Sequence, residues 1–359
     1  MWSATALTAA YPGYMIGLPC SGSQPASRNA PKPWRRLAGF PAFVAGCILL
    51  CSCSTSSVPS VQTVPSATAS TPVTPASRPA AAKTHIMVLV MENQSYNQII
   101  GNSSAPFINL LADRYLRATN SYARGHYSLP NYLEMISGRA YEASGTANDC
   151  TPSSCGPVTG TNVTDQLAAA GITWMAFMGA MQSDCDTSDA GGSGGYGVRH
   201  DPFVYFPQGR KNPACGNDVP SGRLLAMLQG PAPPDFVFYS PSICADGGGD
   251  APCSTIASGD RFLARQLPAI MATPWYRDNG TIILTWDESA DSDKSGAIGD
   301  TGGHVLTIVI SASTKGAPQY RQYVDTAGIL RTIDQAYGVS FLGDAARPES
   351  GTLPLGKTS

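Results

Sequence analysis

The sequence predicts an α/β domain with a mostly parallel central sheet that helices cover on both faces. Between residues 86 and 338, apolar runs of strand length alternate with segments whose apolar residues recur at helical spacing. This alternation is typical of parallel sheets. Glycine and proline are abundant, with 37 and 29 residues in a chain of 359, which argues against a helical bundle. The length suffices for one large domain with additional segments.

The first predicted elements are a strand and two helices. The segment 86–91, IMVLVM, is uninterrupted apolar sequence, which is typical of a strand buried on both faces. Apolar side chains recur at helical spacing in 105–116. The short segment 162–171 is predicted to be a helix that closes at Gly171, because glycine is favoured just beyond a helix C-terminus.

Four later segments are dominated by β-branched, aromatic and other apolar residues and are predicted to be strands. They are 172–178, 235–240, 281–286 and 304–311. Two segments repeat apolar residues at helical spacing and complete the pattern. The segment 260–271 is predicted to be helical in spite of Pro268, and 326–338 is predicted to be a helix that ends at Gly338.

Residues 1–53 are predicted to be a leader. A basic cluster precedes an apolar run at 37–50 that is too short to span a bilayer comfortably and is typical of a signal peptide. The run ends in LCSC, which resembles a bacterial lipobox, so a lipidated Cys53 would anchor the protein to a membrane. An ordinary secretory signal is the alternative. We expect the natural start to lie after Met1, which N-terminal sequencing of the mature protein would test.

Residues 54–82 are almost entirely Ser, Thr, Pro, Val and Ala, a composition that cannot bury a core and predicts a flexible linker. The folded domain is therefore expected at 83–359. The net charge of −2 and the 13% of charged residues offer no basic surface, so we expect no nucleic-acid partner.

Six cysteines follow the leader, and an even number in an exported protein indicates disulfides. We predict pairing between neighbours in the sequence, although 15 connectivities are open. The predicted pairs are Cys150–Cys155, Cys185–Cys215 and Cys244–Cys253. A zinc site is the alternative, but no Cys-x-x-Cys pair occurs among the six.

Acidic residues follow three of the predicted strands. They are Glu92, beside Asn93, then Asp246 and Asp250, and finally Asp287 and Glu288. Ligands bind beyond the carboxyl ends of strands in such sheets, so these groups are expected at one edge. Crowded carboxylates repel one another, and one bound divalent cation would remove the repulsion. The alternative is that each acid is solvated or caps the next helix.

The segment GHYSLPNYLEMISG, 125–138, contains a candidate nucleophile. Ser128 begins a helix-like run with Pro130 in its first turn. A helix N-terminus favours a phosphate group, and a serine near a divalent cation ionises and attacks more easily. The alternative is that Ser128 is an N-cap.

Three of the four histidines are candidates for contact with a phosphate, two because they lie in loop-like sequence and one because it lies two residues before Ser128. They are His126, His200 and His304. An imidazole can bind phosphate or protonate a leaving alkoxide, although a loop histidine can equally be a surface residue. The fourth, His85, is expected to be structural.

The blocks HIMVLVMENQSYNQIIG, HYSLPNYLEMISG, HDPFVYF, DFVFYSPSIC and IILTWDE resemble, in this order, the bacterial phosphoesterase family. That family contains acid phosphatases and phospholipases C and is part of the alkaline phosphatase superfamily. The resemblance covers residues 85–340 and implies an alkaline-phosphatase-like fold for a phosphoesterase catalytic domain at 83–359.

The resemblance also implies roles for individual residues. One divalent metal ion of unknown identity would be held by Glu92, Asn93, Asp287 and Glu288. Ser128 would attack phosphorus and form a phosphoserine that water then hydrolyses.

Further residues would surround the phosphate. The resemblance places Asn131 on the phosphoryl oxygens, and it places Asp246 and the three loop histidines around the pocket. His126 or His304 would be the general acid, and His200 would bind substrate.

The sequence departs from the family pattern after the strand 235–240. A glycine replaces the expected histidine, and Ser242 stands where an asparagine is common. We therefore expect a single metal site, with Asp250 as a weak substitute for the missing group.

The expected function is that of an exported, metal-dependent phosphomonoesterase of acid-phosphatase type, acting on a phosphate-ester substrate. The protein would be lipid-anchored in the bacterial cell envelope or secreted. A phospholipase C is the first alternative. A degenerate fold that binds a ligand without turnover is the second.

Overall fold

A computed structural model describes residues 84–356 of the chain, apart from 194, 291, 297–300 and 318. The predicted leader at 1–53, its Cys53 anchor and the linker at 54–82 lie outside the described residues. Among the helices that the structure describes, none is both long and apolar enough to cross a bilayer.

A seven-stranded sheet in the order β2-β8-β7-β1-β6-β4-β5 forms the centre of the domain. Its strands are β1 His85–Met91, β2 Leu116–Ala118, β4 Trp174–Met178, β5 Asp218–Pro220, β6 Phe236–Ser240, β7 Gly280–Trp286 and β8 Thr307–Ile310. Only β8 runs antiparallel to its neighbours β7 and β2, and the other described pairs are parallel. The predicted mostly parallel sheet is thus confirmed. A small parallel sheet pairs β3 (Ser121–Tyr122) with β9 (Val324–Asp325).

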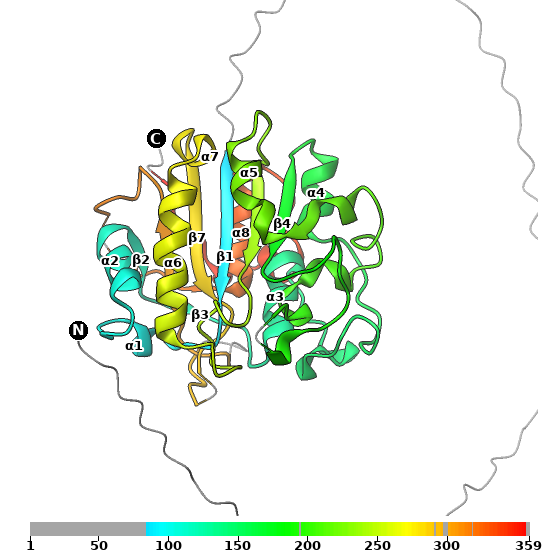
Figure 1. Cartoon of the computed structure of the whole chain (residues 1–359), viewed down its shortest axis with the longest axis horizontal. Helices are drawn as coiled ribbons and strands as arrows, with labels where there is room; N and C mark the ends of the chain where they lie inside the picture. The colour runs from blue at the N-terminus through cyan, green and yellow to red at the C-terminus, as the bar shows by residue number, and fades with distance from the viewer. Residues whose placement is uncertain (1–83, 194, 291, 297–300, 318, 357–359) are drawn as a thin grey trace, which may run out of the picture. The chain divides into compact units, whose positions relative to one another are not determined.

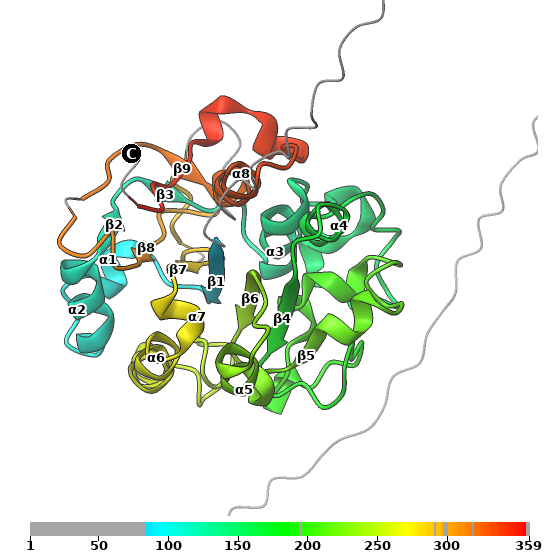
Figure 2. The same cartoon turned by 90° about the horizontal axis from the view of Figure 1, so that it is seen from above.

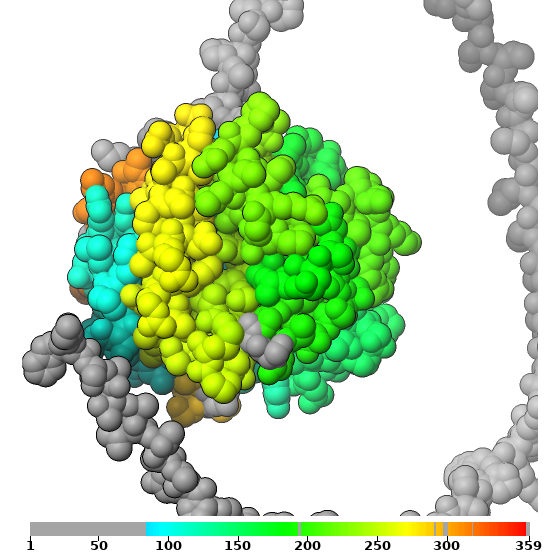
Figure 3. Space-filling view, viewed as in Figure 1, coloured from blue at the N-terminus to red at the C-terminus, as the bar shows by residue number. Residues whose placement is uncertain are grey.

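Helices cover both faces of the sheet, as predicted (Figures 1 and 2). One face carries α3 Ser128–Ser137, α4 Val163–Ala169 and α8 Thr326–Tyr337. The other carries α1 Tyr96–Ile99, α2 Pro106–Arg114, α5 Leu224–Gln229, α6 Ile256–Met271 and α7 Pro274–Arg277. In Figure 3 the yellow α6 and its green neighbours conceal the sheet on this second face.

The central strand β1 shows why both faces need a cover. All seven of its residues are buried, and successive side chains of a strand point to opposite faces. Ile86 and Val88 belong to the core under α3 and α8, whereas Met87 and Leu89 belong to the core under α6. Such a strand must be apolar throughout, which is the pattern found in 86–91.

Short 3₁₀ helices occupy several connections. They are η1 Glu142–Ser144, η2 Thr146–Asn148, η3 Gly191–Ser193, η4 Val198–His200, η5 Pro202–Tyr205, η6 Ala214–Asn217, η7 Ser221–Arg223, η8 Gly343–Ala346 and η9 Pro348–Ser350.

Three predicted boundaries shift for local reasons. The helix predicted at 105–116 ends at Arg114, because Leu116 pairs with Val309 in β2. The helix predicted at 260–271 begins at Ile256, since the Thr255 side chain accepts a hydrogen bond from Ser258 N and caps it there. The strand predicted at 304–311 joins the sheet only over Thr307–Ile310.

The structure contains the three predicted disulfides, Cys150–Cys155, Cys185–Cys215 and Cys244–Cys253. The first and third close loops with sequence separations of 5 and 9, and the second closes a separation of 30. Disulfides of this kind are typical of exported proteins.

Removing the Cys185–Cys215 disulfide should cost more stability than removing Cys150–Cys155. A cross-link removes more entropy from the unfolded chain when it closes a longer loop, and the sequence separations are 30 and 5. The expected losses in the free energy of unfolding are about 4 and about 2 kcal/mol. Denaturant unfolding of the two double Cys→Ala variants measures both, and equal losses would contradict the loop-length argument.

Asp334 on α8 should make the free energy of unfolding fall as pH rises. Its carboxyl is fully buried and accepts one hydrogen bond, from Leu342 N at 3.2 Å, and burial raises its pKa to about 7. An unfolded aspartate titrates near pH 4. The folded state therefore holds the extra proton between about pH 4 and 7, and stability is lost through that window.

In Asp334→Asn the side chain cannot ionise, and its amide oxygen can still accept the hydrogen bond from Leu342 N. We expect the variant to gain about 2–4 kcal/mol over wild type at pH 8 and little at pH 4, as measured by denaturant unfolding at both values. Asp113→Asn is the control, because its side chain is 78% exposed. If the gain in the free energy of unfolding were the same at both pH values, titration of Asp334 would be excluded as its cause.

Candidate active site

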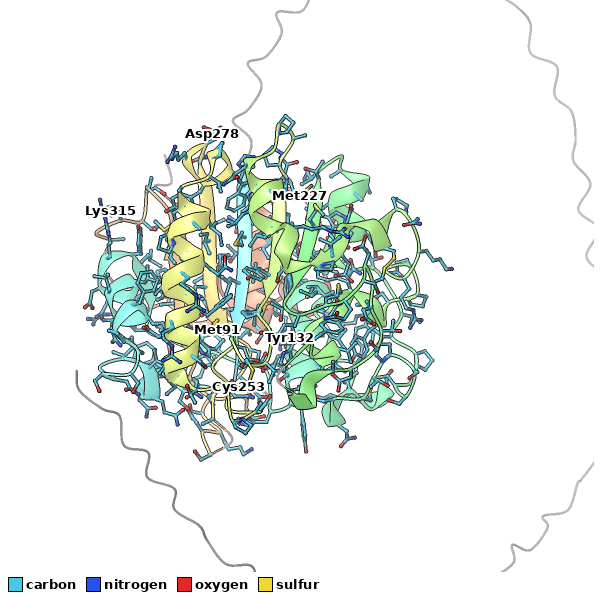
Figure 4. All side chains as sticks on the ribbon, viewed as in Figure 1. Met91, Tyr132, Met227, Cys253, Asp278 and Lys315 are labelled. Carbon is cyan, nitrogen blue, oxygen red and sulfur yellow. A yellow bond between two sulfur atoms is a disulfide. The ribbon has the colours of Figure 1, made fainter. Side chains whose placement is uncertain are left out.

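Three acidic residues meet at the carboxyl ends of three adjacent strands, β7, β1 and β6. Glu92 directly follows β1, Asp287 directly follows β7, and Asp246 lies in the loop after β6. Backbone hydrogen bonds join the three segments, from Glu92 N to Asp246 O at 3.3 Å and from Asp287 N to Met91 O at 3.0 Å. Figure 4 shows Met91 and Tyr132 at this end of the sheet, with Asp278 at the opposite end.

Ser128 is held against the first of these carboxylates. It is the first residue of α3, and its Oγ donates a hydrogen bond to Glu92 Oε2 at 2.8 Å. Tyr132, one turn later on the same helix face, donates from its hydroxyl to Glu92 Oε1 at 2.6 Å. The alternative that Ser128 is an N-cap is wrong, because Tyr127 occupies that position and the serine hydroxyl points to Glu92 instead.

The carboxylates in this group are buried and close together. Glu92 and Asp287 are both inaccessible to solvent. Burial, followed by the charge of Asp246, raises the pKa of Glu92 well above its ordinary value. Burial and the charge of Glu92 do the same to the pKa of Asp287, and burial raises the pKa of Asp246 to about 6. Such crowding favours either bound protons or a bound cation.

His200 completes the buried group, packed on the Tyr132 ring with 5.2 Å between ring centroids. Its Nε2 lies 3.3 Å from Glu92 Oε2, and its Nδ1 lies 4.0 Å from Asp246 Oδ2. Burial, and then the charge of Arg199, lowers the pKa of His200 to about 4. The imidazole is therefore neutral at pH 7 and can offer a lone pair to a metal ion.

A cavity of about 940 Å³ opens above this group. The lining is largely polar and combines predicted site residues with others. It consists of Asn93, Gln94, Gln98, His126, Tyr127, Ser128, Asp149, Asp189, Val198, Arg199, Gly248, Gly249, Asp250, Glu288, Ala290 and Lys294.

The model of the Phosphoesterase family matches residues 102–340, which include α3 with Ser128 and the strands β6 and β7. The chain belongs to the Phosphoesterase family. Membership makes it a hydrolase that acts on phosphoric esters, in agreement with the resemblance seen in the sequence.

Two curated relatives agree with this assignment. A phosphatidylinositol-3-phosphatase of Mycobacterium tuberculosis is 30% identical over 265 residues, which cover 73% of this chain and 79% of the relative. A probable acid phosphatase of Kluyveromyces lactis is 24% identical over 228 residues, which cover 58% of this chain and 48% of the relative.

Solved structures agree with the fold. A protein in the alkaline phosphatase superfamily from Vibrio parahaemolyticus has a TM-score of 0.51 and 12% identity, over 76% of this chain and 71% of that one. A 2-O GAG sulfatase has a TM-score of 0.50 and 11% identity, over 74% and 72% of the two chains. The expected alkaline-phosphatase-like fold is confirmed.

Two of the four residues predicted as metal ligands, Asn93 and Glu288, line the cavity of this phosphoesterase, and the other two, Glu92 and Asp287, are fully buried. Asn93 N donates to Asp287 Oδ1 at 3.2 Å, and Asn93 Nδ2 donates to Asp250 Oδ1 at 3.2 Å. Glu288 lines the cavity wall, where its Oε2 lies 2.8 Å from His126 Nδ1. The other ring nitrogen of His126 lies 2.9 Å from Asp293 O.

Three potential metal ligands lie close together in the structure, and only one of them, Glu92, belongs to the predicted set of ligands. One ligand atom each of Glu92, His200 and Asp250 lies within 4.8 Å of the others. From the sequence, His200 is expected to bind substrate and Asp250 to be only a weak substitute for a missing group. Asp250 lies here because the loop after β6 folds back over the end of β1, where Gly248 passes so close that an added Cβ would stand 2.5 Å from Glu92 Cβ. His200 comes from a different segment, as the last residue of η4.

Arg199 is a cavity residue that sequence reasoning missed. Its Nη2 donates to Asp250 Oδ2 at 2.6 Å, and its Nε lies 3.9 Å from Asp149 Oδ2. Burial lowers its pKa, but the charges of Glu92 and Asp250 outweigh this, so the net shift is upward. Its position beside His200 in RHDPF was the signal available in the sequence.

Two predicted residues lie elsewhere. His304 is not part of the cavity lining. It stacks between Tyr96 and Tyr122, and its Nε2 donates to Thr119 O at 3.1 Å. Asn131 is fully buried, and its amide exchanges hydrogen bonds with the backbone of Gly125 and Tyr127. The structure thus places Asn131 under the loop that carries His126, and its direct contact with phosphate stays a prediction.

Proposed function

We propose that this phosphoesterase is an exported, metal-dependent phosphomonoesterase that works through a phosphoserine at Ser128. The observation that carries the proposal is the contact between Ser128 Oγ and Glu92 Oε2 at 2.8 Å, at the floor of a polar cavity. A hydroxyl that is held by a carboxylate at a helix N-terminus is well placed for attack on phosphorus.

The residues present fit a divalent cation. Asp246 Oδ2 is buried and accepts no hydrogen bond from the described residues. Glu92, His200 and Asp250 offer ligand atoms within 4.8 Å of one another, and Asp287 adds a buried carboxylate. Oxygen donors with one imidazole suit hard or borderline metals. When bound, the cation would stabilise the ionised serine and the negative charge on the phosphoryl oxygens.

The residues of the chain perform the rest of the first step. Ser128 Oγ forms a bond to phosphorus as the bond between phosphorus and the alcohol oxygen breaks. The hydroxyl proton of Ser128 passes to Glu92 Oε2, to which the hydroxyl donates at 2.8 Å. We assign protonation of the leaving alkoxide to His126, because it is the predicted acid that lines the cavity. Water then attacks phosphorus and gives a proton to His126. The bond between phosphorus and Ser128 Oγ breaks, Glu92 returns its proton to Ser128, and phosphate is released.

The relatives' names bear on the substrate. One is a phosphatidylinositol-3-phosphatase and the other a probable acid phosphatase, and both names describe hydrolysis of phosphomonoesters. This supports a phosphomonoester over the diester that a phospholipase C would cleave. The export proposal rests on the three disulfides. Lipid anchoring through Cys53 remains part of the proposal.

Parallel assays of the full-length protein test the proposal. Phenyl phosphate and a phosphocholine diester are supplied separately, each with and without chelator, and metal ions are then added back. We expect hydrolysis of the monoester, its loss on chelation and its recovery with a divalent cation. Faster hydrolysis of the diester would favour the phospholipase C. Turnover of neither ester with any metal would leave the binding protein as the better proposal.

A further inference from the structure

The residue directly before Ser128 is exposed inside the cavity. Tyr127 lines the cavity beside Ser128, and 51% of its surface is accessible. All ten residues of α3, which follows it, are buried. Leu110 and Phe341 are also large exposed apolar residues in the described part of the chain, but neither lines this cavity.

The backbone of Tyr127 has a conformation that is unfavourable for a residue with a side chain. Tyr127 has φ 81° and ψ 130°, a region that glycine reaches easily and a tyrosine does not. The Asn131 Nδ2 donates to Tyr127 O at 3.0 Å and to Gly125 O at 2.8 Å, which fixes the loop. Residues in such conformations cluster at functional sites, and the surrounding structure keeps them there.

The chemistry of the lining gives the ring a distinct role. Carboxylates, amides and Arg199 dominate the cavity wall, and His126 has acceptors at both ring nitrogens. The phenol of Tyr127 therefore offers a flat apolar surface one residue away from the attacking oxygen. A phosphoryl group at Ser128 would direct its alcohol substituent into this open space, where a ring could stack on the tyrosine.

We propose that Tyr127 is a specificity-determining residue that stacks on the leaving group and favours alcohols with a flat ring over open-chain alcohols. This inference rests on the proposed function for its catalytic consequence. Its binding consequence can be measured without turnover, so the two can fail separately.

The test compares two non-hydrolysable probes, phenylphosphonate and methylphosphonate, which share the anionic head and differ in the ring. Their Kd values are measured by calorimetry at one fixed concentration of divalent cation, with full-length wild type, Tyr127→Phe, Tyr127→Ala and Tyr127→Gly. Wild type should bind the phenyl probe about 3–10-fold more tightly than the methyl probe, as expected for one aromatic contact. Tyr127→Phe should keep this preference, and Tyr127→Ala should lose it.

Tyr127→Gly tests whether the preference for the phenyl probe depends on the ring or on the backbone conformation. Glycine relieves the positive φ but removes the ring, so it should lose the preference as alanine does. Tyr141→Ala is the matched control, because Tyr141 also has a positive φ, 56°, and lies outside the cavity lining. It should keep the wild-type ratio of the two Kd values.

Three results would overturn the inference: no preference for the phenyl probe in wild type, a preference that survives in Tyr127→Ala, or its loss in Tyr141→Ala as well. Values of kcat/KM for phenyl phosphate and glycerol 3-phosphate provide the second readout. Tyr127→Ala should lower the phenyl-to-glycerol ratio by the same factor. A wild type that binds the phenyl probe selectively but hydrolyses neither ester would contradict the proposed function and leave this inference standing.

Discussion

Replacing Ser128 with alanine should lower kcat for a phosphomonoester by about 10³-fold or more, the size of loss seen when a nucleophile is removed. The fold should survive, since the Tyr132 hydroxyl still donates to Glu92 Oε1 and His200 still lies 3.3 Å from Oε2. Steady-state kinetics gives the first quantity and thermal unfolding the second.

A second serine on the same helix provides the control. Ser137 is also buried, but its Oγ donates to Leu133 O at 2.6 Å and it does not line the cavity. Ser137→Ala should keep wild-type turnover. An acid quench during turnover should trap phosphoserine in wild type and in Ser137→Ala but not in Ser128→Ala. Trapped phosphate at another residue, or turnover by Ser128→Ala above about one hundredth of wild type, would remove Ser128 from the mechanism.

Replacing Asp287 with asparagine should weaken metal binding but raise the stability of the metal-free protein. The variant removes one of the buried carboxylates that would hold the cation, so metal content and turnover should both fall, turnover by about 10²-fold or more. The metal-free protein should become more stable at neutral pH. Burial and the charge of Glu92 raise the pKa of Asp287, so its ionised form destabilises the fold above the unfolded pKa of about 4.

Thermal unfolding with and without added cation measures both effects. Wild type should gain stability with cation, about 2.7 kcal/mol at a hundredfold excess over Kd, and Asp287→Asn should gain much less. Asp235→Asn is the control, because Asp235 is buried at the other end of β6, where it accepts hydrogen bonds from Thr173. Unchanged metal content in Asp287→Asn would exclude Asp287 as a ligand.

Local sequence was sufficient to predict five strands of the sheet and the acidic edge, but not the short edge strands β2 and β5. A strand buried on both faces must be apolar throughout, so β1 and β7 could be recognised without their neighbours. Parallel strands also end at a common edge, so the positions of Glu92 and Asp287 directly after their strands predict that the two residues lie together. The order of the strands could not be predicted, because β1 pairs with β6 and β7 from far along the chain.

The composition of the site depended on contacts between distant loops. Asp250 and His200 reach Glu92 because the loop after β6 and the 3₁₀ helix η4 fold over the end of β1. His304 had the same local signal as His200, a histidine in loop-like sequence, yet it is stacked between two tyrosines outside the cavity. Asn131 follows Ser128 by three residues but turns its amide to the Gly125 and Tyr127 backbone.

The sequence by itself thus determined which residue types end each strand, since side-chain pattern and strand burial are local properties. The tertiary structure alone decided which of those residues share a site and which way the neighbours of Ser128 point. The ion pair that draws Arg199 to Asp250 joins two segments that are far apart in sequence. No local pattern encodes such contacts, because their free energy depends on groups that only folding brings together.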